Sequence, residues 1–220
     1  MSETTSKGRE RVLDPVERLS EVLFGLIMVL SFTCSISAAT AHRDEVREMV
    51  VGAIGCNLAW GIVDAVMYVL ASVMIRGRRL RVLKSVQSAL DPAEARAAIA
   101  GALDPFLAAR LRPASLEMVR EDLVAVREAP PRPFVARGDL QGAVEVFLLV
   151  FLSTFPVVVP FIVMSDARLA LRTSNAVAVA MLMIGGYSLG HYSGMRPWLV
   201  GASMAALGAL LVGITIALGG

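Results

Sequence analysis

The stretch that decides the fold is residues 49–75, MVVGAIGCNLAWGIVDAVMYVLASVMI, 27 residues without Lys or Arg. As a helix, it is long enough to cross the roughly 30 Å hydrocarbon layer of a membrane with some tilt. Asp64 lies inside it, and a carboxylate at the centre of a bilayer costs at least about 2.5 kcal/mol unless it has a partner, a proton or water. Helical spacing puts Asp64 on one stripe with Asn57, Gly61 and Tyr68, so we expect this stripe to face protein. A functional role for Asp64 is the main hypothesis, and a structural hydrogen bond to Ser, Thr or Asn is the alternative.

The composition places the chain among integral membrane proteins. Of its 220 residues, 56% are apolar and 18% are charged, and the charges are separated from the apolar runs. Four further runs predict membrane-crossing helices, at residues 22–41, 143–164, 173–190 and 198–218. We therefore expect an all-α polytopic membrane protein with five transmembrane helices.

The distribution of basic residues predicts the orientation of the chain. An odd number of crossings puts the two termini on opposite sides. Of the 21 Lys and Arg residues, 17 lie in the N-terminal tail, in residues 76–140 and at Arg196, and four lie in the loops on the other side. Because basic residues accumulate on the cytoplasmic side, we expect a cytoplasmic N-terminus. The abundance of Arg and Ala is typical of GC-rich bacterial genomes, so the expected location is the bacterial inner membrane.

The first apolar run has a second interpretation. A basic tail, an apolar run and the small residues Ala39-Thr40-Ala41 are also typical of a cleavable signal peptide. However, Asp14, Pro15 and Glu17 predict a capped helix start ahead of this run, and cleavage would remove it. We therefore expect a retained transmembrane helix.

Residues 77–140 are predicted to form a small cytoplasmic helical insert. Residues 1–76 then hold the tail and the first two crossings, and residues 141–220 hold the last three. The insert is polar and rich in Ala and Arg, and its prolines divide it into three short helices, at 79–90, 92–103 and 114–128. Asp91 and Ser115 are the expected N-caps of the second and third. The predicted packing stripes are Leu80, Leu83, Val86 and Leu90 on the first helix and Leu116, Val119, Leu123 and Val126 on the third.

Two of the later crossings have features of their own. Pro156 and Pro160 lie in the third crossing, and each removes an amide donor and frees a carbonyl, so this helix is expected to be kinked or locally unwound. Freed carbonyls at this depth are either a tolerated kink or the lining of a cavity or ion site. The fifth crossing has small residues at every fourth position, which predicts close packing on another helix or a second protomer: Gly201, Ala205, Ala209, Gly213 and Ala217.

Counting residues from each cytoplasmic helix end predicts which polar groups share a depth. Asp64 then lies level with Thr33 on the first crossing and with Ser153 and Thr154 on the third. Nearer the cytoplasm, three groups that suit divalent cations fall at a common depth and would form an entrance: Glu21, Glu145 and His191. The alternative for these three is solvation at the interface, and for Met67 it is contact with lipid or core.

This pattern resembles the vacuolar iron transporter family of divalent-metal/proton exchangers. The resemblance covers residues 14–218, with two helices, a three-helix insert and three further helices. It also rests on the run FLSTFPVVVPFIV at 151–163, which looks like the family's third-helix run with two prolines four apart, and on the small residues of the last helix. The resemblance implies a homodimer, a path between the protomers' helices, and transported Fe²⁺ or Mn²⁺ with no tightly bound cofactor.

The resemblance also assigns roles to residues. By position, Glu21 stands near the family's first-helix acid, and Asp64 and Met67 represent its second-helix site. The other candidates for metal and proton binding are Asn57, Thr33 and Glu145. The family's insert collects metal with closely spaced glutamates, and the corresponding candidates here, with His191 at the entrance, are Glu117, Glu121 and Met118. The family's first-helix Asp-Gly motif is missing from this sequence.

The expected function is therefore transport of a divalent metal ion, coupled to protons moving in the opposite direction. The alternative is a membrane scaffold or regulatory subunit that uses the insert as a docking surface and Asp64 as a hydrogen bond between helices. No metal-hydrolase, nucleophile-base or nucleotide-phosphate motif is visible in the sequence, so we do not expect an enzyme. The net charge of +2 reflects basic residues beside an anionic leaflet and does not indicate nucleic-acid binding.

Overall fold

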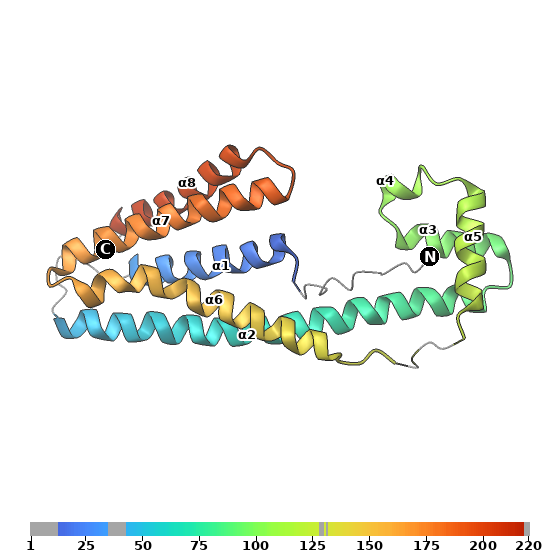
Figure 1. The fold of residues 1–220 in the computed structure, drawn as a ribbon, viewed down its shortest axis with the longest axis horizontal. Coiled ribbons are helices and arrows are strands. Elements are labelled where there is room, and N and C mark those ends of the chain that lie inside the picture. Colours follow the sequence, from blue (N-terminus) through green and yellow to red (C-terminus); the bar gives the residue numbers. More distant parts are fainter. Residues whose placement is uncertain (1–12, 35–42, 128–129, 131, 218–220) are drawn as a thin grey trace, which may run out of the picture. The chain divides into compact units, whose positions relative to one another are not determined.

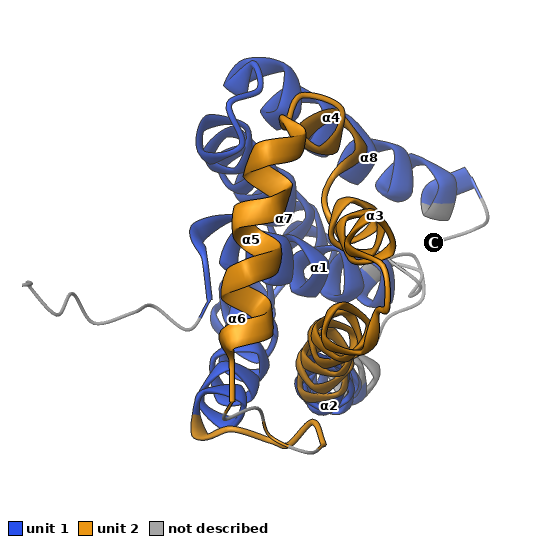
Figure 2. Ribbon diagram, turned by 90° about the vertical axis from the view of Figure 1, so that its right-hand side faces the viewer, with its two compact units in different colours: residues 1–68, 138–220 blue, residues 69–137 orange. Residues whose placement is uncertain are grey.

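The computed structural model describes residues 13–34, 43–127, 130 and 132–217, and all the secondary structure in this part of the chain is helical (Figure 1). This confirms the all-α prediction. The elements are α1 (Pro15–Cys34), α2 (Arg43–Ser88), α3 (Pro92–Ala102), α4 (Pro105–Ala108), α5 (Pro113–Ala125), α6 (Arg137–Val163), α7 (Ala167–Tyr192) and α8 (Pro197–Ala217). They form two compact units, one of residues 1–68 with 138–220 and one of residues 69–137 (Figure 2).

Four of the described helices, α2, α6, α7 and α8, are long and apolar enough to cross a membrane. This confirms that the chain has the helices of a membrane protein. α1 has 20 described residues and carries Glu17, Arg18 and Glu21 near its start. The rest of the predicted first crossing, residues 35–41, lies outside the described residues. The crossing at residues 22–41, which would bring the number of crossings to five, therefore stays a prediction.

α1 begins with the predicted capping box. The Asp14 carboxylate accepts from the amides of Val16, at 2.6 Å, and Glu17, at 3.0 Å. In return, Glu17 Oε2 accepts from the Asp14 amide at 3.0 Å. These bonds satisfy amide groups that have no partner within the first turn of a helix, so the start of α1 is set locally by four residues.

The predicted separate helix at 79–90 is wrong, because α2 continues without interruption from Arg43 to Ser88 over 46 residues. After Ile75 the residues change from apolar to basic, which suits water and lipid headgroups instead of the membrane interior. This segment contains no proline, so nothing in it ends the helix. Asp91 caps α3 as predicted, accepting from the Ala93 amide at 2.9 Å. Ser115 is not a cap, because Pro113 already occupies the first turn of α5 and Arg112 holds the N-cap position.

α6 stays helical through both prolines, so the predicted local unwinding does not occur. The Ser174 hydroxyl of α7 donates to the Val157 carbonyl at 2.7 Å and joins the two helices in this region. A neighbouring helix can bond to the backbone groups that a proline leaves without a partner, and the helix then continues although one amide donor is lost.

α7 and α8 form a close helical hairpin. Gly194 lies in the turn with φ 69°, a left-handed conformation that glycine adopts without strain. A side chain on Gly201 would lie 2.9 Å from the Met183 carbonyl, so this contact needs a glycine. By contrast, a Cβ added at Gly213 would meet no atom of the described residues within 4 Å. The predicted small-residue face therefore packs within the chain only near its start, and its later part is exposed.

The core of the membrane-type unit lies around α1. Leu26 and Leu30 of α1 are fully buried with Leu182 of α7 and Val157 of α6. Gly185 lets Leu23 of α1 approach α7, since an added Cβ there would lie 2.9 Å from the leucine side chain. α1 is thus the central helix of this unit, and its few charged side chains lie at its N-terminal end.

The second unit has a small core of its own, made of Val86, Ala95 and Ile99 with Leu116 and Leu123 packed against them. The predicted stripes are right for these leucines and for Val86. They are wrong for three other positions, since Leu90 is fully exposed and Val119 and Val126 are exposed by 43% and 40%. Leu90 and Val126 lie beyond the last residues of α2 and α5, and Val119 lies on an exposed side of α5. The Gln87 amide donates to the Leu123 and Val126 carbonyls at 3.1 and 2.9 Å and holds the end of α5.

Candidate functional site

A buried polar contact joins α1, α2 and α6. The Asn57 side chain is fully buried, and its Nδ2 donates to Thr154 Oγ1 at 2.6 Å and to the Gly25 carbonyl at 3.2 Å. Gly25 makes this approach possible, because a Cβ there would lie 2.8 Å from the Val150 carbonyl and 2.2 Å from Ser153 Oγ. One asparagine therefore sets the register of three helices.

The other polar atom of this asparagine, Oδ1, is buried without a hydrogen-bond partner among the described residues. A buried polar atom without a partner costs about 1–3 kcal/mol. This oxygen can accept from a hydrogen-bond donor or contribute to the coordination of a cation. The arrangement thus holds one unused acceptor among helices α1, α2 and α6.

Asp64 lies seven residues, or about two turns and 10 Å, further along α2 than Asn57. Its Oδ2 is also buried and has no partner among the described residues. The Asp64 carboxylate is close enough to that of Glu21 on α1 for the two to repel each other. Repulsion between two carboxylates favours binding of a proton or a cation.

The predicted depth of Asp64 is therefore wrong. We expected it level with Thr154, but the structure pairs Thr154 with Asn57 and puts Asp64 near Glu21. Counting residues from each helix end assumes that all helices enter the membrane at one level. The register is instead set by close contacts such as that of Gly61, where an added Cβ would lie 3.0 Å from the Phe147 ring.

The predicted polar stripe of α2 does face protein. Asn57 and Gly61 are buried, and Asp64 and Tyr68 are half-buried. Gly142 of α6 makes room for the Tyr68 ring, whose nearest carbon would lie 2.3 Å from an added Cβ. Small residues on α2 and α6 thus bring the two helices together on either side of Asp64.

Glu145 is held by an arginine that the sequence did not single out. Arg18 Nη2 lies 2.8 Å from Glu145 Oε2, and both side chains are partly exposed. Arg18 Nε is buried without a partner among the described residues. Arg18 also lies one turn before Glu21 on α1. With Arg18, Glu145, Glu21 and Asp64 all ionised, the formal charges of these four groups sum to −2, which one divalent cation or two protons would balance.

The other predicted membrane residues do not join this group. Thr33 is buried, but its hydroxyl donates to the Leu30 carbonyl of its own helix at 3.2 Å. Met67 is 57% exposed on the outside of α2. His191 is exposed in the last turn of α7, where its ring meets that of Tyr192 edge-on. The exposed side chains of Met67 and His191 can contact lipid, water or a further protein chain.

In the insert, Glu117 is fully engaged in ion pairs. Its Oε2 lies 2.6 Å from Arg96 and its Oε1 lies 2.6 Å from Arg120. These two hydrogen-bonded guanidinium groups lower the pKa of the Glu117 carboxyl. Glu121 and Met118 are exposed on the same helix. Glu117 therefore stabilises the α3–α5 contact, and a metal ion would have to displace two arginines to bind it.

Within the described residues, no group of three or more His, Cys, Asp or Glu side chains could hold a metal ion. Glu21, Asp64 and Glu145 thus do not form a chelate in this arrangement. No protein-family model matches the chain, and no curated protein matches it.

Proposed function

We propose that the protein is a membrane transporter that exchanges a divalent cation, Fe²⁺ or Mn²⁺, for protons. The observation that carries the proposal is Asp64 of the apolar helix α2, whose Oδ2 is buried without a partner among the described residues. Glu21 of α1 lies within electrostatic range of this carboxylate. The pair lies in the unit that contains membrane-length helices. The proposed protein has five crossings, a cytoplasmic N-terminus and a location in the bacterial inner membrane, and acts as a homodimer, as the resemblance to vacuolar iron transporters implies.

The physical reason for exchange is the net charge of Glu21, Asp64 and the Arg18–Glu145 pair. A net charge of −2 is costly inside an apolar helix bundle, so the group needs a cation or protons. A divalent ion and two protons each neutralise it, and the two occupants therefore exclude each other. Carboxylate oxygens suit Mn²⁺, and they form part of many Fe²⁺ sites. The unused Asn57 Oδ1, about two turns and 10 Å before Asp64 on α2, offers the next oxygen on a path through the bundle.

Metal binding in this proposal includes a rearrangement of side chains. Because the described carboxylates do not form a three-acid group, binding requires Glu145 to leave Arg18 and to move toward Glu21 and Asp64. The Arg18 pair is partly exposed, and exposed ion pairs are worth only about 0–1 kcal/mol, so its loss is a small part of the cost. A second protomer can supply further ligands.

The experiment that tests the proposal is flux of Fe²⁺, Mn²⁺ and other divalent metals into proteoliposomes across a pH gradient. Asp64→Asn keeps the shape and most hydrogen-bonding capacity but can neither carry a proton nor bind a cation as an anion. We expect this variant to fold and to lose pH-dependent flux. Asp122→Asn, an exposed acid on α5, is the matched control and keeps its flux. Equal flux in the wild type and Asp64→Asn, at matched amounts of folded protein, contradicts the role of Asp64.

A membrane scaffold or regulatory subunit is the second candidate function. It is favoured by the ion pairs that occupy Glu145 and Glu117, since these two predicted ligands already bind arginines. In a scaffold, Asn57 and Asp64 serve contacts between helices, and asparagine replaces Asp64 without loss. A wild-type protein that carries none of the tested metals would favour this function.

A further inference from the structure

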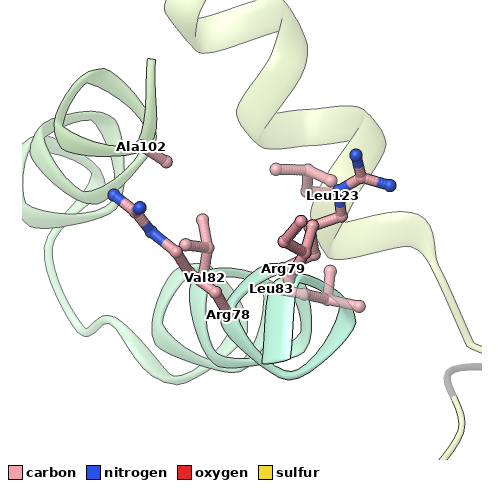
Figure 3. Close-up of a pocket in the computed structure, with 7 residues that line it drawn as sticks. Arg78, Arg79, Val82, Leu83, Ala102 and Leu123 are labelled. Atoms are coloured by element: carbon pink, nitrogen blue, oxygen red, sulfur yellow. The ribbon is translucent and has the colours of Figure 1, made fainter. Parts of the chain in front are cut away.

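A trough in the second unit is lined by α2, the end of α3 and the side of α5 (Figure 3). Its cavity measures about 320 Å³ and is lined by Ile75, Arg78, Arg79, Val82, Leu83, Ala102 and Leu123. Figure 3 shows Arg78 reaching toward Ala102 and Arg79 reaching toward Leu123, with Val82 between the two arginines. The trough therefore has an apolar floor and a guanidinium group on each side.

The structure shows no acidic partner for the two arginines of the trough among the described residues. Both are exposed, and neither makes an ion pair or hydrogen bond in the described part of the chain. α2 contains no acidic residue after Asp64, whereas five basic residues lie between positions 76 and 84. An occupant of this trough must therefore be anionic to match its charge.

The residues before the trough continue the same helix face as an apolar surface. Met74, Arg78 and Val82 follow one another at four-residue steps, as do Ile75, Arg79 and Leu83, so each row runs along one side of the helix. Met74 and Ile75 are 72% and 53% exposed at the end of the membrane-crossing run. Arg78 and Arg79 lie one turn, about 6 Å, beyond them, which is the depth of the lipid headgroups.

We propose that this face of α2 binds one anionic phospholipid of the adjacent leaflet. The acyl chains lie along Met74 and Ile75, and the phosphate lies between the guanidinium groups of Arg78 and Arg79. The headgroup enters the trough over Val82 and Leu83. Arginine binds phosphate with paired N–H groups, and the apolar floor keeps water away and strengthens the attraction. Basic clusters next to a membrane-crossing helix have this preference for acidic lipids in general.

The test uses the full-length protein in detergent, titrated with phosphatidylglycerol or phosphatidylcholine and measured by native mass spectrometry and thermal unfolding. We expect retained phosphatidylglycerol and a higher melting temperature with that lipid. Arg78→Gln with Arg79→Gln should weaken its binding about thirtyfold, because each basic residue near an acidic lipid contributes about fivefold. Ala102→Phe should also weaken binding, because the ring would fill the trough without changing its charge.

A charge-matched control separates this site from general attraction between basic residues and acidic lipid. Arg81→Gln with Arg112→Gln removes the same charge from two exposed positions outside the trough and should leave binding unchanged. An equal loss in this control, or unchanged binding in Ala102→Phe, would overturn the proposal. Equal stabilisation by inorganic phosphate would assign the trough to a soluble anion and overturn the lipid as its occupant.

Discussion

Gly25→Ala would place a methyl group where α1 meets α6. The new Cβ would lie 2.8 Å from the Val150 carbonyl, which belongs to the backbone and cannot rotate away. An ordinary contact starts at 3.4 Å, so α1 must move outward by about 0.6 Å. The hydrogen bond from Asn57 to the Gly25 carbonyl is already 3.2 Å long and would be broken by that movement.

The size of the effect follows from three contributions to the free energy of unfolding. Overpacking costs about 1–3 kcal/mol, and the lost hydrogen bond costs about 1 kcal/mol. The better helix propensity of alanine returns about 1 kcal/mol. We therefore expect Gly25→Ala to lower the free energy of unfolding by about 1–3 kcal/mol.

The assay is unfolding in mixed detergent micelles, followed by helix content and by Trp60 fluorescence. Trp60 packs edge-on against Phe24, next to Gly25, and reports on the α1–α2 contact. Gly213→Ala is the matched control, because an added Cβ there meets no atom within 4 Å, and it should be neutral or more stable by up to about 1 kcal/mol. If Gly25→Ala proves as stable as Gly213→Ala, Gly25 does not face the Val150 carbonyl closely, and this register of α1 against α6 is refuted.

Two further predictions concern assembly and the insert. Gly213→Leu should leave the stability of the protomer unchanged, because a Cβ added at Gly213 meets no atom of the described residues within 4 Å. The variant should abolish the proposed dimer in cross-linking and light scattering, and a fully dimeric variant would exclude this face from the interface. Arg96 and Arg120 lower the pKa of Glu117, so the stabilisation by these ion pairs is complete above the ordinary value of 4.5 and is lost as pH falls below it. Glu117→Gln should remove this part of the acid sensitivity, measured as melting temperature against pH, and an unchanged pH profile would contradict the role of the ion pairs.

Local features of the sequence predicted the helices and several of their starts. The apolar run of residues 49–75 is long enough to span a bilayer whatever surrounds it, so composition alone indicated a membrane helix. The caps at Asp14 and Asp91 were predictable because each involves residues two or three positions apart. The change to a basic sequence after Ile75 was mistaken for a helix end, since hydropathy reports the surroundings of a helix and not its continuity.

The candidate site was only partly predictable from the sequence. The stripe of Asn57 and Asp64 faces protein, as helical periodicity required. That Glu145 pairs with Arg18, 127 positions away, had no local signal.

The tertiary structure alone decides which polar groups share a level. Asn57 meets Thr154, and Asp64 lies near Glu21, because Gly25, Gly61 and Gly142 let neighbouring helices approach at particular heights. Helix formation depends on bonds between residues four apart, which the sequence contains as neighbours. The sliding of one helix against another depends on the fit of side chains far apart in the chain, and a shift of one turn changes every pair across the contact.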